Sequence, residues 1–132
     1  TSGGDSERSF SMGAKSFTDL RVWQETHALS LRLQEMTETF PPAQKFRMVD
    51  QIMRAVDSVG SNIAEGFGRR TPRDKVHFYK MAFASAEEIK HRLLASKGRK
   101  FVRDISDAVR SVESVSKMLR SLINRILRED CS

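Results

Sequence analysis

Two carboxylate–histidine pairs are the residues of this chain whose types and spacing best fit metal chemistry. Asp74 lies three positions before His77, and Glu88 lies three positions before His91. Helical bundles with di-iron centres use this spacing, because it brings both ligands to one face of a helix. Such centres need matching pairs on two facing helices, whereas here both pairs belong to one predicted helix and neither histidine falls on its apolar side. We therefore expect surface residues, with no metal and no other cofactor.

Nucleophilic and acid–base catalysis have equally little support. Cys131 is the single cysteine and lies one residue from the end of the chain, where no base is placed to activate its thiol. Glu65 has no carboxylate or histidine at a catalytic spacing in its own helix. It is expected to pair with an arginine, either Arg69 of the same helix or Arg54 of a neighbour. No phosphate-binding loop or dinucleotide-binding glycine pattern occurs, so the sequence predicts a protein that is not an enzyme.

Positive charge is concentrated in one part of the chain. The formal net charge is +6, and residues 69–103 hold eleven Lys or Arg against three Asp or Glu, which leaves this segment at +8 and the remainder at −2. Such a segment attracts polyanions, although an ordinary basic surface that keeps the protein soluble would have the same composition. The candidate nucleic-acid contacts form two clusters: Arg69, Arg70, Arg73 and Lys75, and then Lys97, Arg99, Lys100 and Arg103.

A second candidate surface lies on the helix predicted for residues 43–67. Apolar residues recur there every three or four positions and mark the core side of the helix. The opposite side carries small and hydrogen-bonding residues, although Ser and Asn weaken a helix. This side is either a tolerated solvent surface or a second packing surface, against another subunit or a ligand. The candidate subunit contacts are Arg54, Ser58, Ser61, Asn62 and Glu65.

The fold class predicted from the periodicity is all-α, an antiparallel up-down-up-down four-helix bundle. The first helix is expected to begin at Thr18 as its N-cap and to end near residue 38, before Pro41-Pro42. The second spans about 43–67, and it ends in Gly66-Phe67-Gly68, where glycine in the left-handed conformation is expected to close the helix.

The last two helices are predicted from the same signals. The third begins with Thr71 as N-cap and Pro72 at the first helical position, and Gly98 is its expected terminator. The fourth spans about 101–128 and carries a near-heptad apolar seam. In an up-down bundle the turns at 39–42 and 95–100 share one end, and the turn at 66–71 lies at the other.

A chain of 132 residues, 39% of them hydrophobic, is expected to form one domain. We expect a mobile tail over 1–15, the bundle over 16–128 and a frayed C-terminus over 129–132. Met12 is a candidate natural start, which would make the residues before it a cloning remnant. No apolar run approaches the roughly 18 residues that a membrane span needs. With no secretory signal and a lone cysteine, the expected location is cytoplasmic, without a membrane partner.

Several short motifs resemble a known family. They are Phe17-x-x-Leu20-x-Val22-Trp23-Gln24, Phe40-Pro41, Gln51-Ile52-x-Arg54-Ala55, Asn62-Ile63-Ala64-Glu65-Gly66 and Arg69. Over residues 17–127 the chain resembles the four-helix-bundle proteins encoded within intervening sequences of bacterial large-subunit ribosomal RNA. That family is similar to the accessory variability proteins of diversity-generating retroelements. The resemblance implies a homopentameric ring, a basic surface suited to nucleic acid, and no catalysis. The turn at 95–100 departs from it, because a more apolar, Leu-Gly-Tyr-like sequence is expected there.

Charge and resemblance together predict a non-enzymatic homo-oligomeric bundle that binds RNA or DNA through basic surfaces. The alternative is a protein–protein adaptor, for example an accessory subunit of a reverse transcriptase. In that case the basic charge would serve an acidic partner or an RNA that both proteins hold. Salt-dependent binding of RNA by the isolated protein would separate the two functions.

Overall fold

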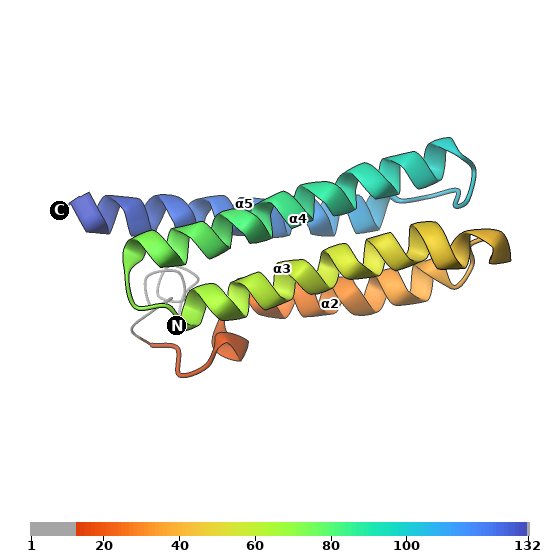
Figure 1. Ribbon diagram of the computed structural model, residues 1–132. Helices are drawn as coiled ribbons and strands as arrows, with labels where there is room; N and C mark the ends of the chain where they lie inside the picture. Colours follow the sequence, from red (N-terminus) through yellow and green to blue (C-terminus); the bar gives the residue numbers. More distant parts are fainter. Residues whose placement is uncertain (1–12, 132) are drawn as a thin grey trace.

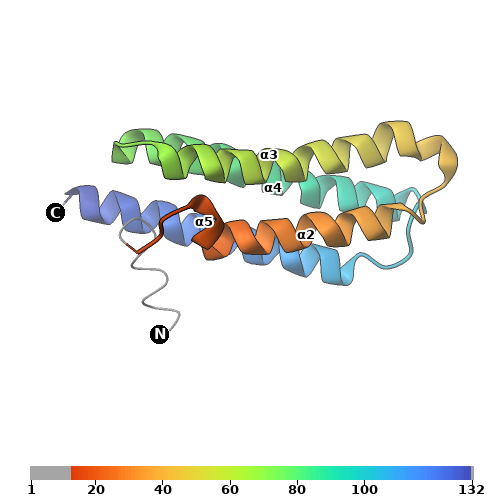
Figure 2. The same cartoon turned by 90° about the horizontal axis from the view of Figure 1, so that it is seen from below.

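Four long helices make up most of the protein, and they run alternately up and down (Figures 1 and 2). The computed structural model describes residues 13–131, and the side chains as far as residue 130. The long helices are α2 (Arg21–Thr37), α3 (Asp50–Gly68), α4 (Pro72–Gly98) and α5 (Ser106–Cys131). Each packs against two neighbours, since α3 lies between α2 and α4, and α5 closes the bundle against α4 and α2. The predicted all-α up-down-up-down bundle is confirmed.

Three short helical turns complete the described chain: η1 (Phe17–Asp19), η2 (Pro42–Gln44) and the π-helical turn η3 (Lys45–Val49). The connection through η2 and η3 lies at the same end of the bundle as the turn between α4 and α5 (Figures 1 and 2). The rings of Phe40 and Phe101 join these two connections, with their centroids 6.1 Å apart. We call this the η3 end. The turn between α3 and α4 lies at the opposite end, as predicted.

The core is formed by the apolar stripes that the sequence predicts. On α5 the apolar seam is buried, apart from Val109, which is half-buried; its other members are Val112, Val115, Leu119, Leu122 and Ile126. From α4, Tyr79, Ile89 and Leu93 are fully buried. Leu31 of α2 is an apolar residue outside the core: it is exposed, because its position lies outside the arc of α2 that faces α3 and α5.

The start of the first helix differs from the prediction, whereas the start of α4 agrees with it. Ser16, rather than Thr18, is the N-cap, because a 3-10 turn precedes α2: the Ser16 hydroxyl accepts from the Thr18 amide at 3.3 Å. Helix α2 then begins after Leu20 without a side-chain cap. At α4, the Thr71 hydroxyl accepts from the Asp74 amide at 3.1 Å.

The end of α3 corrects the prediction about glycine. Within the described residues no glycine has a positive φ, so neither Gly66 nor Gly68 closes the helix in the left-handed conformation. The chain leaves α3 through Arg69 in an extended conformation, φ −77° and ψ 152°. The ammonium of Lys75 instead satisfies the terminal carbonyls of α3, donating to Gly66 O at 3.2 Å and to Phe67 O at 2.9 Å.

The end of α4 is a Schellman motif whose left-handed residue is Lys100, with φ 66°. The Phe101 amide donates to Ser96 O, and the Lys100 amide donates to Lys97 O, both at 2.9 Å. Helix α4 stops at Gly98 as predicted, but the glycine does not supply the left-handed conformation.

Helix α5 begins later and ends later than predicted. Helix α5 begins at Ser106, later than expected, because the Asp104 carboxylate accepts from the Ser106 amide at 2.9 Å. It continues to Cys131, so most of the segment expected to fray is helical. Residues 1–12 of the predicted tail lie outside the described residues, as does Ser132. None of the described helices has an apolar stretch long enough to cross a membrane.

Candidate nucleic-acid interface

The first predicted cluster of four cations lies at the end of the bundle that holds the turn between α3 and α4. Two of these cations, Lys75 and Arg69, form contacts within the chain. Lys75 is half-buried against the carbonyls of α3, and this burial lowers the pKa of its ammonium. Arg69 donates to the Glu65 carboxylate at 2.8 Å, and its guanidinium lies 4.6 Å from the centre of the Phe78 ring. The predicted pairing of Glu65 with Arg69 of the same helix is therefore confirmed. Lys75 stabilises the turn between α3 and α4, and only part of Arg69 remains open to a ligand.

The other two predicted cations at this end, Arg70 and Arg73, are free. Both are exposed, and in the part of the chain that the structure describes their side chains make no hydrogen bond or ion pair. Arg73 borders a hollow of about 370 Å³ between the N-terminal half of α4 and the C-terminus of α5. The residues that line it are Pro72, Arg73, Val76, His77, Lys80, Leu127 and Asp130. The hollow thus offers cations to an anionic ligand, with one carboxylate at its border.

The second predicted cluster lies together at the η3 end. Lys97, Arg99, Lys100 and Arg103 are all exposed on the turn between α4 and α5. Lys97 lies near the Asp104 carboxylate. Hydrogen bonds from Ser106 lower the pKa of Asp104, and the positive charges of Lys97 and Arg110 lower it further. Lys97 thus interacts electrostatically with Asp104. The side chains of the other three cations have no partner within the described residues, and all four charges face solvent.

The structure adds three residues to this end that the sequence analysis did not single out. Lys45, Phe46 and Arg47 follow one another on η3, and all three are exposed. Phe46 is 90% exposed, compared with 43–54% for the other exposed large apolar residues. The signal in the sequence was an aromatic residue between two cations, three to five positions after Pro42 of the helix stop.

The five candidate subunit contacts on α3 do not all lie on the outer surface of the bundle. Ser58 and Asn62 are half-buried: the Ser58 hydroxyl lies 2.8 Å from the hydroxyl of Ser85 on α4, and the Asn62 amide donates to Ser58 O of its own helix at 2.9 Å. The other three members, Arg54, Ser61 and Glu65, are exposed. Two of the five candidates therefore belong to packing within the chain, and three remain available to another subunit.

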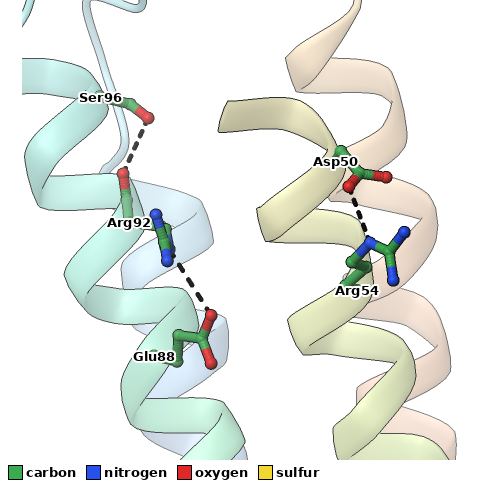
Figure 3. A network of polar contacts seen from close by, with 5 residues as sticks. All are labelled: Asp50, Arg54, Glu88, Arg92 and Ser96. Atoms are coloured by element: carbon green, nitrogen blue, oxygen red, sulfur yellow. Dashed lines mark hydrogen bonds and ion pairs between the residues drawn. The ribbon is translucent and has the colours of Figure 1, made fainter. Parts of the chain in front are cut away.

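Helices α3 and α4 each carry an ion pair near the η3 end, as Figure 3 shows. Arg54 donates to the Asp50 carboxylate at 2.7 Å on α3, and on α4 Arg92 lies 3.6 Å from the Glu88 carboxylate (Figure 3). Glu88 is therefore paired with an arginine rather than directed at His91, which is exposed, as is His77. Among the described side chains no three His, Cys, Asp or Glu residues come close enough to hold a metal ion.

The fold and these surfaces define a basic all-α four-helix bundle with cations gathered at its two ends. Residues 18–121 match the family model described as 23S rRNA-intervening sequence protein, and the chain belongs to this family. The bundle also superposes on the 1.70 Å crystal structure of a protein of unknown function from the S23 ribosomal protein family of Bacteroides thetaiotaomicron VPI-5482. The TM-score is 0.72 at 22% sequence identity, over 78% of this chain and 95% of that chain, which shows a shared fold. A comparison with curated proteins gave no match.

Proposed function

We propose that this protein is a non-enzymatic homo-oligomeric bundle that binds nucleic acid electrostatically at its two ends. The observation that carries this proposal is the set of cations that have no partner among the described residues: Arg70, Arg73, Arg99, Lys100 and Arg103. Exposed and unpaired guanidinium and ammonium groups neutralise phosphates at little cost, because no internal ion pair has to break. The description of the family, which names 23S rRNA, supports RNA as the ligand.

A ring of subunits would strengthen this binding. The resemblance to intervening-sequence proteins motivates a homopentamer, and the exposed residues Arg54, Ser61 and Glu65 on α3 are the proposed contacts. In such a ring each subunit repeats both cationic ends. Weak contacts of single subunits would then add through multivalency along one polyanion.

The first test is a titration of RNA with the protein at several salt concentrations. The variants are Arg70→Gln/Arg73→Gln for one end and Arg99→Gln/Arg103→Gln for the other, with Lys117→Gln on the middle of α5 as a control for charge alone. Wild-type affinity should fall log-linearly with salt, and each end variant should bind more weakly with a smaller slope. Wild-type binding that ignores salt, or two end variants that bind like the wild type, would contradict the proposal.

The second test is light scattering on the wild type and on two variants of Glu65. Glu65→Arg places a cation beside Arg69, whereas Glu65→Gln removes the ion pair without adding a like charge. If the exposed stripe lies between subunits, Glu65→Arg should dissociate the oligomer further than Glu65→Gln does. A wild-type protein that is monomeric at tens of micromolar would contradict the proposed ring of subunits.

An adaptor that holds another protein is the alternative, in line with the resemblance to the accessory proteins of diversity-generating retroelements. A groove of about 290 Å³ between α2 and α3 favours it. Trp23 lines this groove, and its ring stacks on that of His27 with the ring centroids 5.1 Å apart. Gly60 also lines the groove and, having no side chain, leaves space next to Trp23. The adaptor function, for example as a subunit of a reverse transcriptase, replaces the first proposal if the isolated protein shows no salt-dependent RNA binding.

A further inference from the structure

Phe46 is an unusual surface residue, because it is a large aromatic residue that is not buried in the core. Burial of a phenylalanine side chain in a core stabilises a protein, because it removes a large apolar surface from water. The adjacent core positions are taken by Phe40, which is 2% exposed, and by Met48, which is 4% exposed. Phe46 instead projects from η3, a π-helical turn. Such turns are rare and occur frequently at functional sites.

The surroundings of the Phe46 ring are cationic. Lys45 and Arg47 flank it in the sequence, and within the described residues neither side chain makes a hydrogen bond or ion pair. The turn between α4 and α5 lies at the same end, held beside the η2–η3 connection by the contact of Phe40 with Phe101 (Figures 1 and 2). That turn contributes the exposed cations Lys97, Arg99, Lys100 and Arg103. The η3 end therefore presents one exposed aromatic ring among six cations from two connections.

The backbone at this end carries strain that preserves one of these charges. Lys100 has a φ of 66°, a conformation that glycine adopts without penalty and that is unfavourable for other residues. A lysine at this position keeps an ammonium at the same end of the bundle as Phe46, at the expense of stability.

An exposed aromatic among phosphate-binding cations is the combination that proteins use for single-stranded nucleic acid. The cations follow the backbone, and the ring stacks on a base whose face is free. In a duplex every base face is covered by its neighbours, so the ring would have nothing to bind. A protein partner is a poorer fit, because charged residues are depleted in the cores of protein–protein interfaces, and this ring has charged residues on both sides in the sequence.

We infer that the η3 end binds single-stranded nucleic acid, with an unpaired base stacked on the ring of Phe46. This inference rests on the proposed function and adds the kind of strand to it. Phe46 would act as the stacking platform, and Lys45, Arg47 and the cations of the turn between α4 and α5 would neutralise the phosphates on either side.

The experiment compares three ligands of equal length: a single-stranded RNA, the same strand in a duplex, and a strand that keeps its phosphates but carries abasic sites. The proteins are the wild type, Phe46→Ala, Phe46→Tyr, which keeps a ring, and Leu31→Ala, a control for loss of an exposed apolar side chain on α2. Phe46→Ala should weaken binding of the single strand by about 5- to 100-fold. Phe46→Tyr and Leu31→Ala should bind it like the wild type. The abasic strand should bind wild type and Phe46→Ala equally.

Several results would overturn the inference. Equal affinity of wild type and Phe46→Ala for the single strand would do so, as would an equal loss on the abasic strand, because stacking requires the base. A change of oligomeric state in Phe46→Ala, seen by light scattering, would show that the phenyl group of Phe46 is a subunit contact instead of a stacking platform. If the wild type binds none of the three ligands, the proposed function itself fails, and this outcome is distinct from the others.

Discussion

The ring of Tyr79 on α4 packs directly on the Cα of Gly66 on α3, leaving no room for a side chain. A Cβ on Gly66 would lie 2.7 Å from Cε1 and 2.9 Å from Cδ1 of Tyr79. Gly66 is the last residue of the Asn-Ile-Ala-Glu-Gly motif, and the structure gives it a packing role between two helices. Its neighbour Gly68 has no atom within 4 Å of the same position.

Gly66→Ala should destabilise the protein by about 1–3 kcal/mol, because Tyr79 is fully buried and has no space into which to retreat. Gly68→Ala is the matched control at the same helix end and should leave the melting temperature unchanged or raise it, since alanine favours a helix. Thermal melts of both variants test this. Equal melting temperatures for the two variants would contradict the close packing.

Tyr79→Phe should leave the melting temperature unchanged or raise it. The Tyr79 hydroxyl is buried, and within the described residues it has no hydrogen-bond partner. Burial also raises the pKa of this hydroxyl, so it stays neutral. Removing an unpaired hydroxyl removes a desolvation cost of about 1–3 kcal/mol, whereas Tyr79→Ala should cost about 3–5 kcal/mol through the cavity it leaves. A clear fall in the melting temperature of Tyr79→Phe would show that the hydroxyl is bonded.

Lys75→Met should lower stability by about 1 kcal/mol, because it removes the donor to two carbonyls at the end of α3 and keeps the aliphatic chain. RNA affinity should hardly change, since the ammonium is already engaged. Arg70→Gln is the comparison and should do the reverse, weakening RNA binding without a change in the melt. A strong loss of RNA binding in Lys75→Met would return Lys75 to the set of nucleic-acid contacts.

Lys100→Gly should stabilise the protein by about 1 kcal/mol and weaken its binding to RNA. Glycine relieves the left-handed strain at φ 66°, but the substitution also removes an exposed charge. Arg99→Gly removes the same charge at a residue with φ −87°, where glycine relieves no strain, and should not stabilise. Thermal melts of both variants measure the effect of backbone strain on stability, and salt titrations measure the effect of the lost charge on RNA binding. A lower melting temperature for Lys100→Gly than for the wild type would contradict backbone strain at Lys100.

Asp104→Ala should lower the melting temperature at neutral pH, and the difference from the wild type should shrink in acid. The folded protein holds the pKa of Asp104 below its ordinary value, chiefly through the hydrogen bonds from Ser106. A depressed carboxyl pKa adds stability above the unfolded pKa, and this contribution is lost as the pH falls through the folded pKa. Asp104→Asn, which keeps the acceptor and loses the charge, should be the milder variant. A difference that does not depend on pH would contradict the assignment.

The sequence by itself determined the features that depend on neighbours along the chain. Thr71 and Pro72 start α4 as predicted, since capping needs only the hydroxyl and amides within one turn. The seam of α5 is buried as predicted, because one apolar stripe at helical spacing has only one side on which to bury itself. The stop at Pro41-Pro42, and the ends to which the turns go, follow from the same local rules. The two basic clusters could also be listed from the sequence.

Only the tertiary structure decided what each of those residues does. Gly66 was expected to close its helix, but it accommodates Tyr79 of the next one, which no periodicity within α3 records. Lys75 and Ser58 were assigned to outer surfaces, and they bond instead across the contact between α3 and α4. Phe46 was not singled out from the sequence, and the π-helical turn places it outside the core. In each case the deciding partner lies on another helix, or the turn geometry sets the direction of the side chain, and local spacing carries neither.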